Sequence, residues 1–174
     1  MRILILLFIC FTICACGDKS TTDKFTGGEY FDLKGFFEKE SLRLNRLHIP
    51  VVKTVSRNHN SETKKVQVNW ENELALFIES DINKPAWKNS YRKVSNGSSI
   101  EYTALEDNLK SRKIRIIRIA DRVKSIHITN RTANLLYTST EDLAYLPDSV
   151  YIIKKEQSVK MLGTNQYVIT GRLR

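Results

Sequence analysis

Cysteines are the most reactive side chains of this chain, and they lie at Cys10, Cys14 and Cys16. A thiolate can be alkylated, acylated or bound to a metal. No cysteine follows Cys16, so the rest of the chain can form neither a disulfide nor a thiol-based catalytic site. Thiol chemistry is therefore restricted to the N-terminal segment.

Other catalytic side chains show no organised pattern. The histidines, His48, His59 and His127, lack the close spacing of a local zinc motif. Carboxylate pairs such as Glu71 and Glu73 are too close in sequence to face each other across a cleft. The chain has no G-x-S-x-G elbow and no glycine-rich phosphate loop. We expect no enzyme activity, no metal and no cofactor, although a serine, histidine and aspartate that meet only in the folded chain would escape this search.

The N-terminal segment has the pattern of an export leader. Arg2 precedes an apolar run from Ile3 to Ile13, and small residues lead into Cys16. The run has about 11 residues, whereas a helix that spans a bilayer needs about 20. The alternatives to a lipid-anchored leader are an ordinary secretory leader cleaved near Ala15 and an uncleaved anchor.

The segment Ile13-Cys14-Ala15-Cys16 resembles the bacterial lipobox. In lipoproteins that carry this motif, the cysteine is thioether-linked to diacylglycerol and the peptide before it is removed. The resemblance implies a signal peptide over residues 1–15 and lipidation of Cys16, with palmitate-type acyl chains that anchor the protein in a membrane of the cell envelope. Each buried CH₂ contributes about 0.8 kcal/mol, so an anchor of three acyl chains would be essentially permanent. Gly17 after the cysteine resembles the pattern of delivery to the outer membrane.

Charge and composition restrict the partners of the mature chain. The formal charge of the whole chain is +9, and the loss of Arg2 with the leader would leave about +8. A positive surface attracts lipid head groups, lipopolysaccharide phosphates, acidic glycans or nucleic acid. The envelope address argues against nucleic acid. Residues 16–28 are the lipidated cysteine and a polar, flexible tether, and residues 29–174 form one domain large enough for a core without disulfides.

Two amphipathic helices are expected in the first half of the domain. The first covers Tyr30–Leu47, with Asp32 as its N-cap, and the second covers Trp70–Ile82, with Asn69 as its N-cap. A proline follows each helix and ends it.

Strands are expected over the remainder of the domain. Between the helices, two short segments form a hairpin around Asn58-His59-Asn60-Ser61. Eight further segments, separated by turn signals, predict an antiparallel meander. The eight are Trp87–Ser95, Ile100–Glu106, Lys113–Ala120, Val123–Asn130, Ala133–Glu141, Val150–Glu156, Val159–Leu162 and Tyr167–Leu173. Their clearest turns are Asn96-Gly97-Ser98, Ala120-Asp121-Arg122 and Gly163-Thr164-Asn165.

These elements predict an α+β domain with a strongly curved, half-barrel-like antiparallel sheet. The alternation of cations and isoleucines slips between Ile116 and Ile117, which indicates a β-bulge or a strand that changes sides. Two helices can cover only part of a sheet of this size, so we expect it to curl around them. The plan resembles LolA and LolB, the half-barrel carriers of lipoprotein sorting, whose concave face accommodates acyl chains. It also resembles small envelope lipoproteins of unassigned activity.

Two sets of side chains are candidates for binding. Aromatic residues could line an apolar cavity in the curved sheet, although core packing also explains them; the candidates are Phe36, Phe37, Tyr102, Tyr137 and Tyr151. A basic hairpin could meet an anionic surface, although a solvated sheet face also explains it. Its cations are Lys113, Arg115, Arg118, Arg122 and Lys124.

Two functions follow from these sets. The first is a non-catalytic envelope lipoprotein that binds a lipid or another apolar ligand in the curved sheet. The second is a structural or assembly subunit that docks on an outer-membrane complex through its basic surface. Both are attached to the membrane through Cys16.

Overall fold

The computed structural model describes residues 29–58 and 60–173. The predicted signal peptide, Cys16 and the tether lie outside the described residues, as does His59. Among the helices of the described residues, none is long and apolar enough to cross a membrane.

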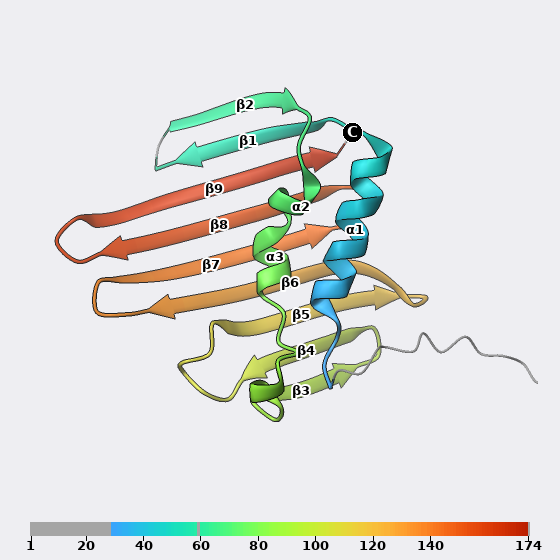
Figure 1. The fold of residues 1–174 in the computed structure, drawn as a ribbon, viewed down its shortest axis with the longest axis vertical. Coiled ribbons are helices and arrows are strands. Elements are labelled where there is room, and N and C mark those ends of the chain that lie inside the picture. The colour runs from blue at the N-terminus through green and yellow to red at the C-terminus, as the bar shows by residue number, and fades with distance from the viewer. Residues whose placement is uncertain (1–28, 59, 174) are drawn as a thin grey trace, which may run out of the picture.

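Nine strands form one curved, open antiparallel sheet, which confirms the α+β class (Figure 1). The strands follow the order β2-β1-β9-β8-β7-β6-β5-β4-β3. Strands β3 to β9 are therefore a meander, and the β1–β2 hairpin joins it beside β9. The bounds are β1 Val51–Arg57, β2 Asn60–Val66, β3 Tyr91–Asn96, β4 Ser99–Ala104, β5 Ser111–Ile119, β6 Arg122–Ala133, β7 Tyr137–Leu146, β8 Val150–Val159 and β9 Gly163–Leu173.

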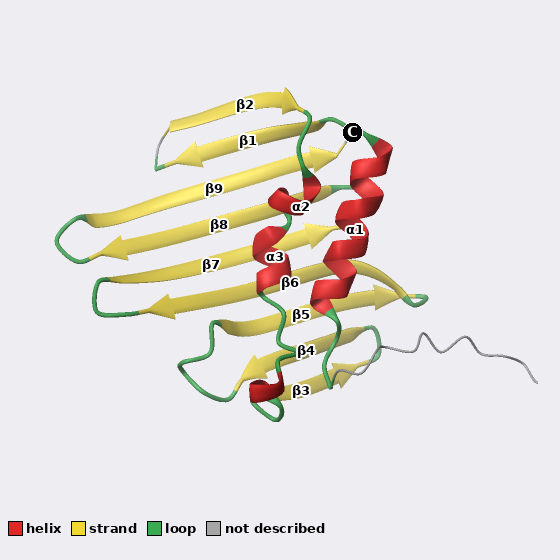
Figure 2. Cartoon of the chain, in the orientation of Figure 1, coloured by secondary structure: helices red, strands yellow, loops and turns green. Residues whose placement is uncertain are grey.

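All helices lie on one face of this sheet (Figure 2). They are α1 Leu33–Leu47, α2 Trp70–Glu73, α3 Ala75–Glu79 and the 3₁₀ helix η1 Pro85–Trp87. Both predicted N-caps are confirmed. The Asp32 carboxylate accepts from the backbone N–H of Gly35 at 2.8 Å, and the Asn69 side chain accepts from that of Asn72 at 3.1 Å.

The predicted helix Trp70–Ile82 is wrong in its length, because the chain forms two short helices with a break at Leu74. Leu74 has φ −97° and ψ 6°, outside the α-helical region. Trp70, Leu74 and Phe77 are all fully buried. These three residues have the i, i+4, i+7 spacing of one helix face, and the break at Leu74 leaves all three of them buried against the sheet.

Asp81 and Asn83, in the segment after α3, bind the start of α1. Oδ1 of Asp81 accepts from the backbone N–H of Leu33 at 3.1 Å and that of Lys34 at 3.3 Å. The Asn83 side chain accepts from the N–H of Tyr30 and donates to a backbone carbonyl. This corner satisfies donors at the helix N-terminus that have no partner within the helix.

Two of the predicted strands, Val159–Leu162 and Trp87–Ser95, differ from the structure. The segment Val159–Leu162 is not a strand of its own, because β8 continues to Val159 and the chain then turns at Met161, whose φ is 71°. Consequently β9 begins at Gly163, where a turn was expected. The predicted strand Trp87–Ser95 begins only at Tyr91, because Pro85–Trp87 forms a 3₁₀ helix.

Strand β7 also lies later than the predicted Ala133–Glu141. The side chain of Asn134 accepts from the backbone N–H groups of Leu136 and Tyr137, both at 2.9 Å. This local turn, which competes with strand pairing, delays the strand to Tyr137–Leu146. The predicted bulge of β5 between Ile116 and Ile117 is wrong. The pairing of β5 with β6 does shift between Ile117 and Arg118, but the extra residue there is Lys124 of β6, and the extra residue of β5 is Arg112.

Two tyrosines of the central strands connect the helices to the sheet. Tyr145 is fully buried against Phe37 and Phe77, and its hydroxyl donates to the carboxylate of Glu40 on α1. Tyr151 is equally buried, and its hydroxyl donates to the carboxylate of Glu73 on α2. Helices α1 and α2 therefore each carry one carboxylate that accepts a hydrogen bond from a tyrosine of the sheet.

Gly171 makes room for the second of these tyrosines. It lies opposite Tyr151 in the sheet, and a Cβ atom at this position would lie 2.0 Å from the ring. Trp70 packs against the ring of Tyr151 with 5.9 Å between ring centroids. The ring is held by Gly171 and Trp70, so any side chain at position 171 must displace it.

We expect Gly171→Ala to lower the free energy of unfolding by about 2–4 kcal/mol, because the methyl group overpacks the core and disturbs the bond to Glu73. Urea denaturation measures the loss. Gly97→Ala is the matched control: Gly97 also has a special role, with φ 52° in a turn, but no atom lies within 4 Å of its Cβ position. This control should cost about 1 kcal/mol, and an equal loss in both variants would contradict the packing argument.

The two buried tyrosines also predict a loss of stability in alkaline solution. Burial and the bond to Glu40 raise the pKa of Tyr145 above its usual 10.0, and burial and Glu73 raise that of Tyr151. A raised pKa in the folded chain gives stability that is complete below about pH 10 and is lost as the pH rises beyond it.

Tyr145→Phe should therefore cost about 1–2 kcal/mol at neutral pH and make the decline in stability above pH 10 shallower. Denaturation curves at neutral and alkaline pH give both quantities. Tyr137→Phe, at a half-exposed position, controls for the removal of one phenol hydroxyl. An unchanged alkaline decline in Tyr145→Phe would show that this phenol does not govern it.

Candidate functional site: the uncovered face of the sheet

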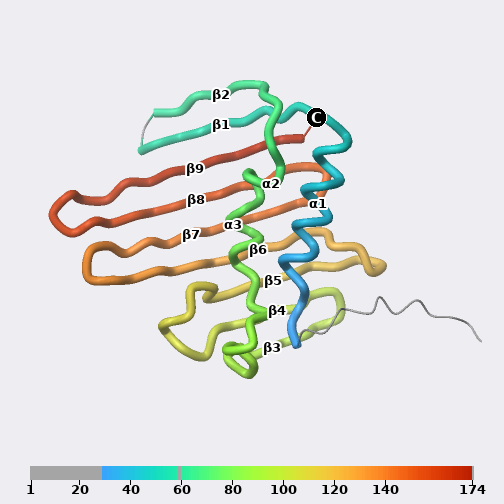
Figure 3. Tube along the Cα trace, viewed as in Figure 1, coloured from blue at the N-terminus to red at the C-terminus, as the bar shows by residue number. Residues whose placement is uncertain are grey.

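The sheet face opposite the helices carries no helix among the described residues (Figure 3). We call it the uncovered face. Side chains alternate between the two faces along each strand, and residues opposite each other in register share a face. The buried positions Ile114, Ile126 and Tyr145 belong to the helix side, so their neighbours in sequence point to the uncovered face.

Two rows of side chains cross the middle of the uncovered face. One row runs through Arg115, His127, Ala144, Ile152 and Thr170, on strands β5 to β9. The second row is adjacent and runs through Lys113, Thr129, Asp142, Lys154 and Val168. The pairing of the meander thus brings together residues that lie far apart in the sequence.

A hollow of about 520 Å³ lies between these rows, and we call it the central hollow. Cations stand at its two sides, on β5 and β8, and small or aliphatic side chains lie between them. Its lining is Lys113, Arg115, Ile117, His127, Ile128, Thr129, Asp142, Leu143, Ala144, Ile152 and Lys154. It offers positive charge around a partly apolar floor.

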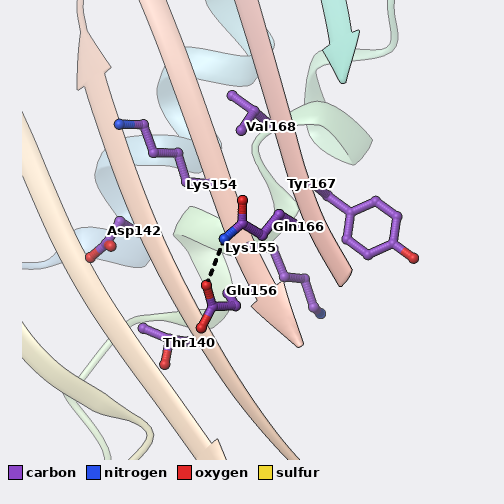
Figure 4. A pocket seen from close by; sticks show the side chains of 8 residues that line it. All are labelled: Thr140, Asp142, Lys154, Lys155, Glu156, Gln166, Tyr167 and Val168. Carbon is purple, nitrogen blue, oxygen red and sulfur yellow. Dashed lines mark hydrogen bonds between the residues drawn. The ribbon is translucent and has the colours of Figure 1, made fainter. Parts of the chain in front are cut away.

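A second hollow of about 310 Å³ continues it over β7, β8 and β9 (Figure 4). The two hollows share Asp142 and Lys154. Gln166 donates to Glu156 across the second hollow at 2.9 Å, while Tyr167 points away from it. Together the hollows form a shallow, largely polar trough across five strands.

Glu101 on β4 balances part of the positive charge beside the central hollow. Its carboxylate lies 3.0 Å from Nζ of Lys113 and 2.7 Å from the guanidinium of Arg115. The hydrogen bonds from Lys113 and Arg115 lower the pKa of Glu101 below its usual 4.5. On the other side of the hollow, Thr129 donates to Asp142 at 2.9 Å. Lys113, Arg115, Thr129 and Asp142 are therefore held by partners on neighbouring strands.

The five predicted basic residues divide into two groups. Lys113 and Arg115 line the central hollow. Arg118, Arg122 and Lys124 lie at the turn between β5 and β6, where Ala120 and Asp121 have φ of 47° and 61°. Arg118 contacts the Asp121 carboxylate at 3.3 Å. The predicted hairpin is confirmed, but its cations do not form one patch.

The five predicted aromatic residues lie elsewhere, and four of them form part of the core or pack against it. Phe37, Tyr102 and Tyr151 are buried, and Phe36 packs against this core. Tyr137 is half-exposed at the start of β7. Neither the central hollow nor its continuation is lined by any of these five side chains.

Sequence reasoning missed His127, Asp142, Ile152 and Lys154 as members of one site. They lie on the uncovered side of β6, β7 and β8, and only the register of these three strands brings them together. The alternation of polar and buried residues in β7 was the available signal. Within the described residues, no group of three or more histidine, aspartate and glutamate side chains could hold a metal ion.

No protein-family model matches this sequence, and no curated protein or solved structure matches it either.

The position of Glu101 predicts an acid-sensitive ion pair. NMR titration of the Glu101 carboxyl carbon should give a midpoint below 4.5, and Lys113→Gln with Arg115→Gln should raise it. The lowered pKa of Glu101 adds to the stability of the fold above pH 4.5, and this contribution is lost as the pH falls. The ion pair lies at the protein surface, so its contribution to the free energy of unfolding is less than about 1 kcal/mol. Lys64→Gln on the edge strand β2 is the control and should leave the midpoint unchanged. The same midpoint in the double variant would contradict the assignment.

Proposed function

We propose that this protein is a lipid-anchored, non-catalytic protein of the bacterial cell envelope that docks an acidic surface of a partner protein on its uncovered face. The observation that carries the proposal is the central hollow, with cations on both sides of a partly apolar floor, on a sheet face that has no helix over it among the described residues.

The charge of the uncovered face supports an acidic partner. Register assigns eight cations and three carboxylates to it. The cations are Lys65, Arg92, Lys113, Arg115, Arg122, Arg131, Lys154 and Arg172, and the carboxylates are Glu101, Asp142 and Glu156. An excess of positive charge raises the rate of encounter with an acidic surface and disfavours basic ones.

The area of the uncovered face and its mixture of polar and apolar side chains favour a protein partner over a small molecule. Nine strands spaced about 4.8 Å apart give a width near 40 Å, and strands of this length give a patch on the order of 1,000 Å². A standard interface buries about 800 Å² per partner. Half-buried Ile117, Ile152 and Val168 lie among the polar side chains, and this mixture is typical of interfaces that form and dissociate.

The N-terminal segment supports the envelope address. The resemblance of Ile13-Cys14-Ala15-Cys16 to a lipobox and the polar residues 17–28 that follow suit a domain tethered to a membrane, in the outer membrane if Gly17 acts as the resemblance implies. A tethered domain stays close to other proteins of that membrane, which raises the effective concentration of a partner.

The first function predicted from the sequence, binding of an apolar ligand in the curved sheet, stays a prediction. Its aromatic residues pack against one another and against the helices, for example Phe37 on Tyr145 with 5.1 Å between ring centroids. The surface of the uncovered face favours docking over that function.

Photo-cross-linking in the bacterium tests the docking proposal. A photoreactive residue in place of His127, which is exposed on β6, should give one discrete cross-linked product. Arg115→Glu with Lys154→Glu should reduce its yield at least about fivefold, because both sides of the central hollow then repel an acidic partner. When the experiment is repeated with the two purified proteins, the yield of the cross-linked product should also fall as the salt concentration rises.

The matched control is Arg46→Glu with Lys64→Glu, two exposed cations on α1 and β2 that lie away from the hollow. It makes the same change in net charge and should leave the yield unchanged. A product that is absent, or is reduced equally by both double variants, would contradict docking at this face.

A further inference from the structure

Four large apolar side chains protrude from two loops at one end of the sheet. Leu135 and Leu136 lie between β6 and β7 and are 93% and 72% exposed, and Met161 and Leu162 lie between β8 and β9 and are 98% and 81% exposed. They are the four most exposed large hydrophobic residues of the described chain. We call them the apolar tip.

The two loops form one structure. Successive turns of a meander alternate between its ends, so the β6–β7 and β8–β9 loops lie at the same end, as Figure 1 shows. The backbone N–H of Lys160 donates to the carbonyl of Leu136 at 3.0 Å and joins them directly. The Asn134 side chain holds the first loop, and Met161 adopts a φ of 71° in the second. The loops thus present four apolar side chains together.

The apolar tip has no structural role in the core. The core consists of buried residues such as Leu143 and Ile153 in the interior of the same strands. Full exposure of four large apolar groups is unfavourable in water, so a surface that covers them is expected. Four side chains are too few for a stable protein interface, which needs about 800 Å² per partner.

A lipid bilayer fits this tip better than a second protein does. Loop tips with leucine and methionine can enter the acyl region without burying strand backbone, while nearby cations meet the head groups. Lys160 lies in the second loop and Arg131 near the end of β6 that leads into the first, and both are exposed. An anionic bilayer surface offers both interactions at once.

We propose that the apolar tip inserts into the membrane surface and forms a second membrane contact, besides the expected lipid at Cys16. The described domain begins at residue 29, so 12 residues separate it from Cys16, and an extended chain of that length spans about 40 Å. The contact does not depend on the docking function, because it uses loops at the end of the sheet and leaves the central hollow free.

Flotation with lipid vesicles tests the tip without the anchor. A chain that starts at Gly17 retains every residue that the structure describes, and with them the buried core from Tyr30 onward. This chain should float with vesicles of phosphatidylethanolamine and phosphatidylglycerol and should remain bound in high salt. Leu135→Ser with Met161→Ser should weaken binding by about tenfold or more, since burial of a leucine-sized side chain is lost twice.

Leu42→Ser with Leu47→Ser, on the exposed side of α1, is the matched control, because these leucines are 57% and 50% exposed. It should bind as the unaltered chain does, and circular dichroism should show both double variants folded. Flotation that is absent, is unaffected by the tip substitutions, or disappears in high salt would overturn the proposal, the last because it would assign binding to surface cations alone. Self-association without vesicles that the tip substitutions abolish would also overturn it. None of these outcomes involves the cross-link at His127, so the docking proposal can fail or hold independently.

Discussion

The hydrogen bonds from Tyr145 to Glu40 and from Tyr151 to Glu73 attach the helices to the sheet. They lie within an aromatic cluster that includes Phe37, Phe77 and Trp70, so the pairing is both polar and tightly packed. A half-buried carboxylate needs a donor, and a buried phenol needs an acceptor. The position of both helix segments on the sheet, and hence which sheet face is covered, follows from satisfying these two needs together.

A second polar contact fixes the end of α3. Ser80, which follows this helix, accepts at its carbonyl from the hydroxyl of Ser111 at 2.9 Å, and its own hydroxyl accepts from Asn130 at 2.8 Å. Asn130 lies opposite Glu141, which pairs with Lys155 at 3.1 Å. These groups form a polar ladder across β5 to β8 on the helix side. Such a ladder sets the register of helix and sheet more specifically than apolar contacts alone.

Because the helices cover only one face, the opposite face must stay soluble while it remains a regular sheet. Opposite charges in neighbouring strands, such as Glu101 with Lys113 and Arg115, stabilise the pairing of the strands. The edge strand β2 is exposed and carries Glu62, Lys64 and Lys65, which disfavour pairing with another sheet. A polar surface is thus a direct consequence of a helix layer on one side only. The charged side chains that keep this face soluble are the same ones that the proposed docking uses.

The sequence predicted the elements that depend on local signals. Asp32 and Asn69 are caps, and Gly97 and Ala120-Asp121 are turns; each acts through its near neighbours. The later start of β7 was not predicted, because it depends on the side-chain hydrogen bonds of Asn134. The extra residue between β5 and β6 was assigned to the wrong strand, because its place depends on how the two strands pair. The central hollow was missed for the same reason, since its residues are brought together only by strand register.

The geometry of the meander relates the uncovered face to the apolar tip. Strands β6 to β9 run from the tip toward the opposite end, so a bilayer at the tip would leave their direction close to the membrane normal. The sheet would then stand perpendicular to the membrane. Its uncovered face would be directed along the membrane surface, toward neighbouring membrane proteins. Insertion of the tip would also restrict the rotation of a domain that a flexible tether alone leaves free. A domain oriented in this way loses less rotational freedom when a partner binds, so the same weak, polar contacts give tighter docking than they would in solution.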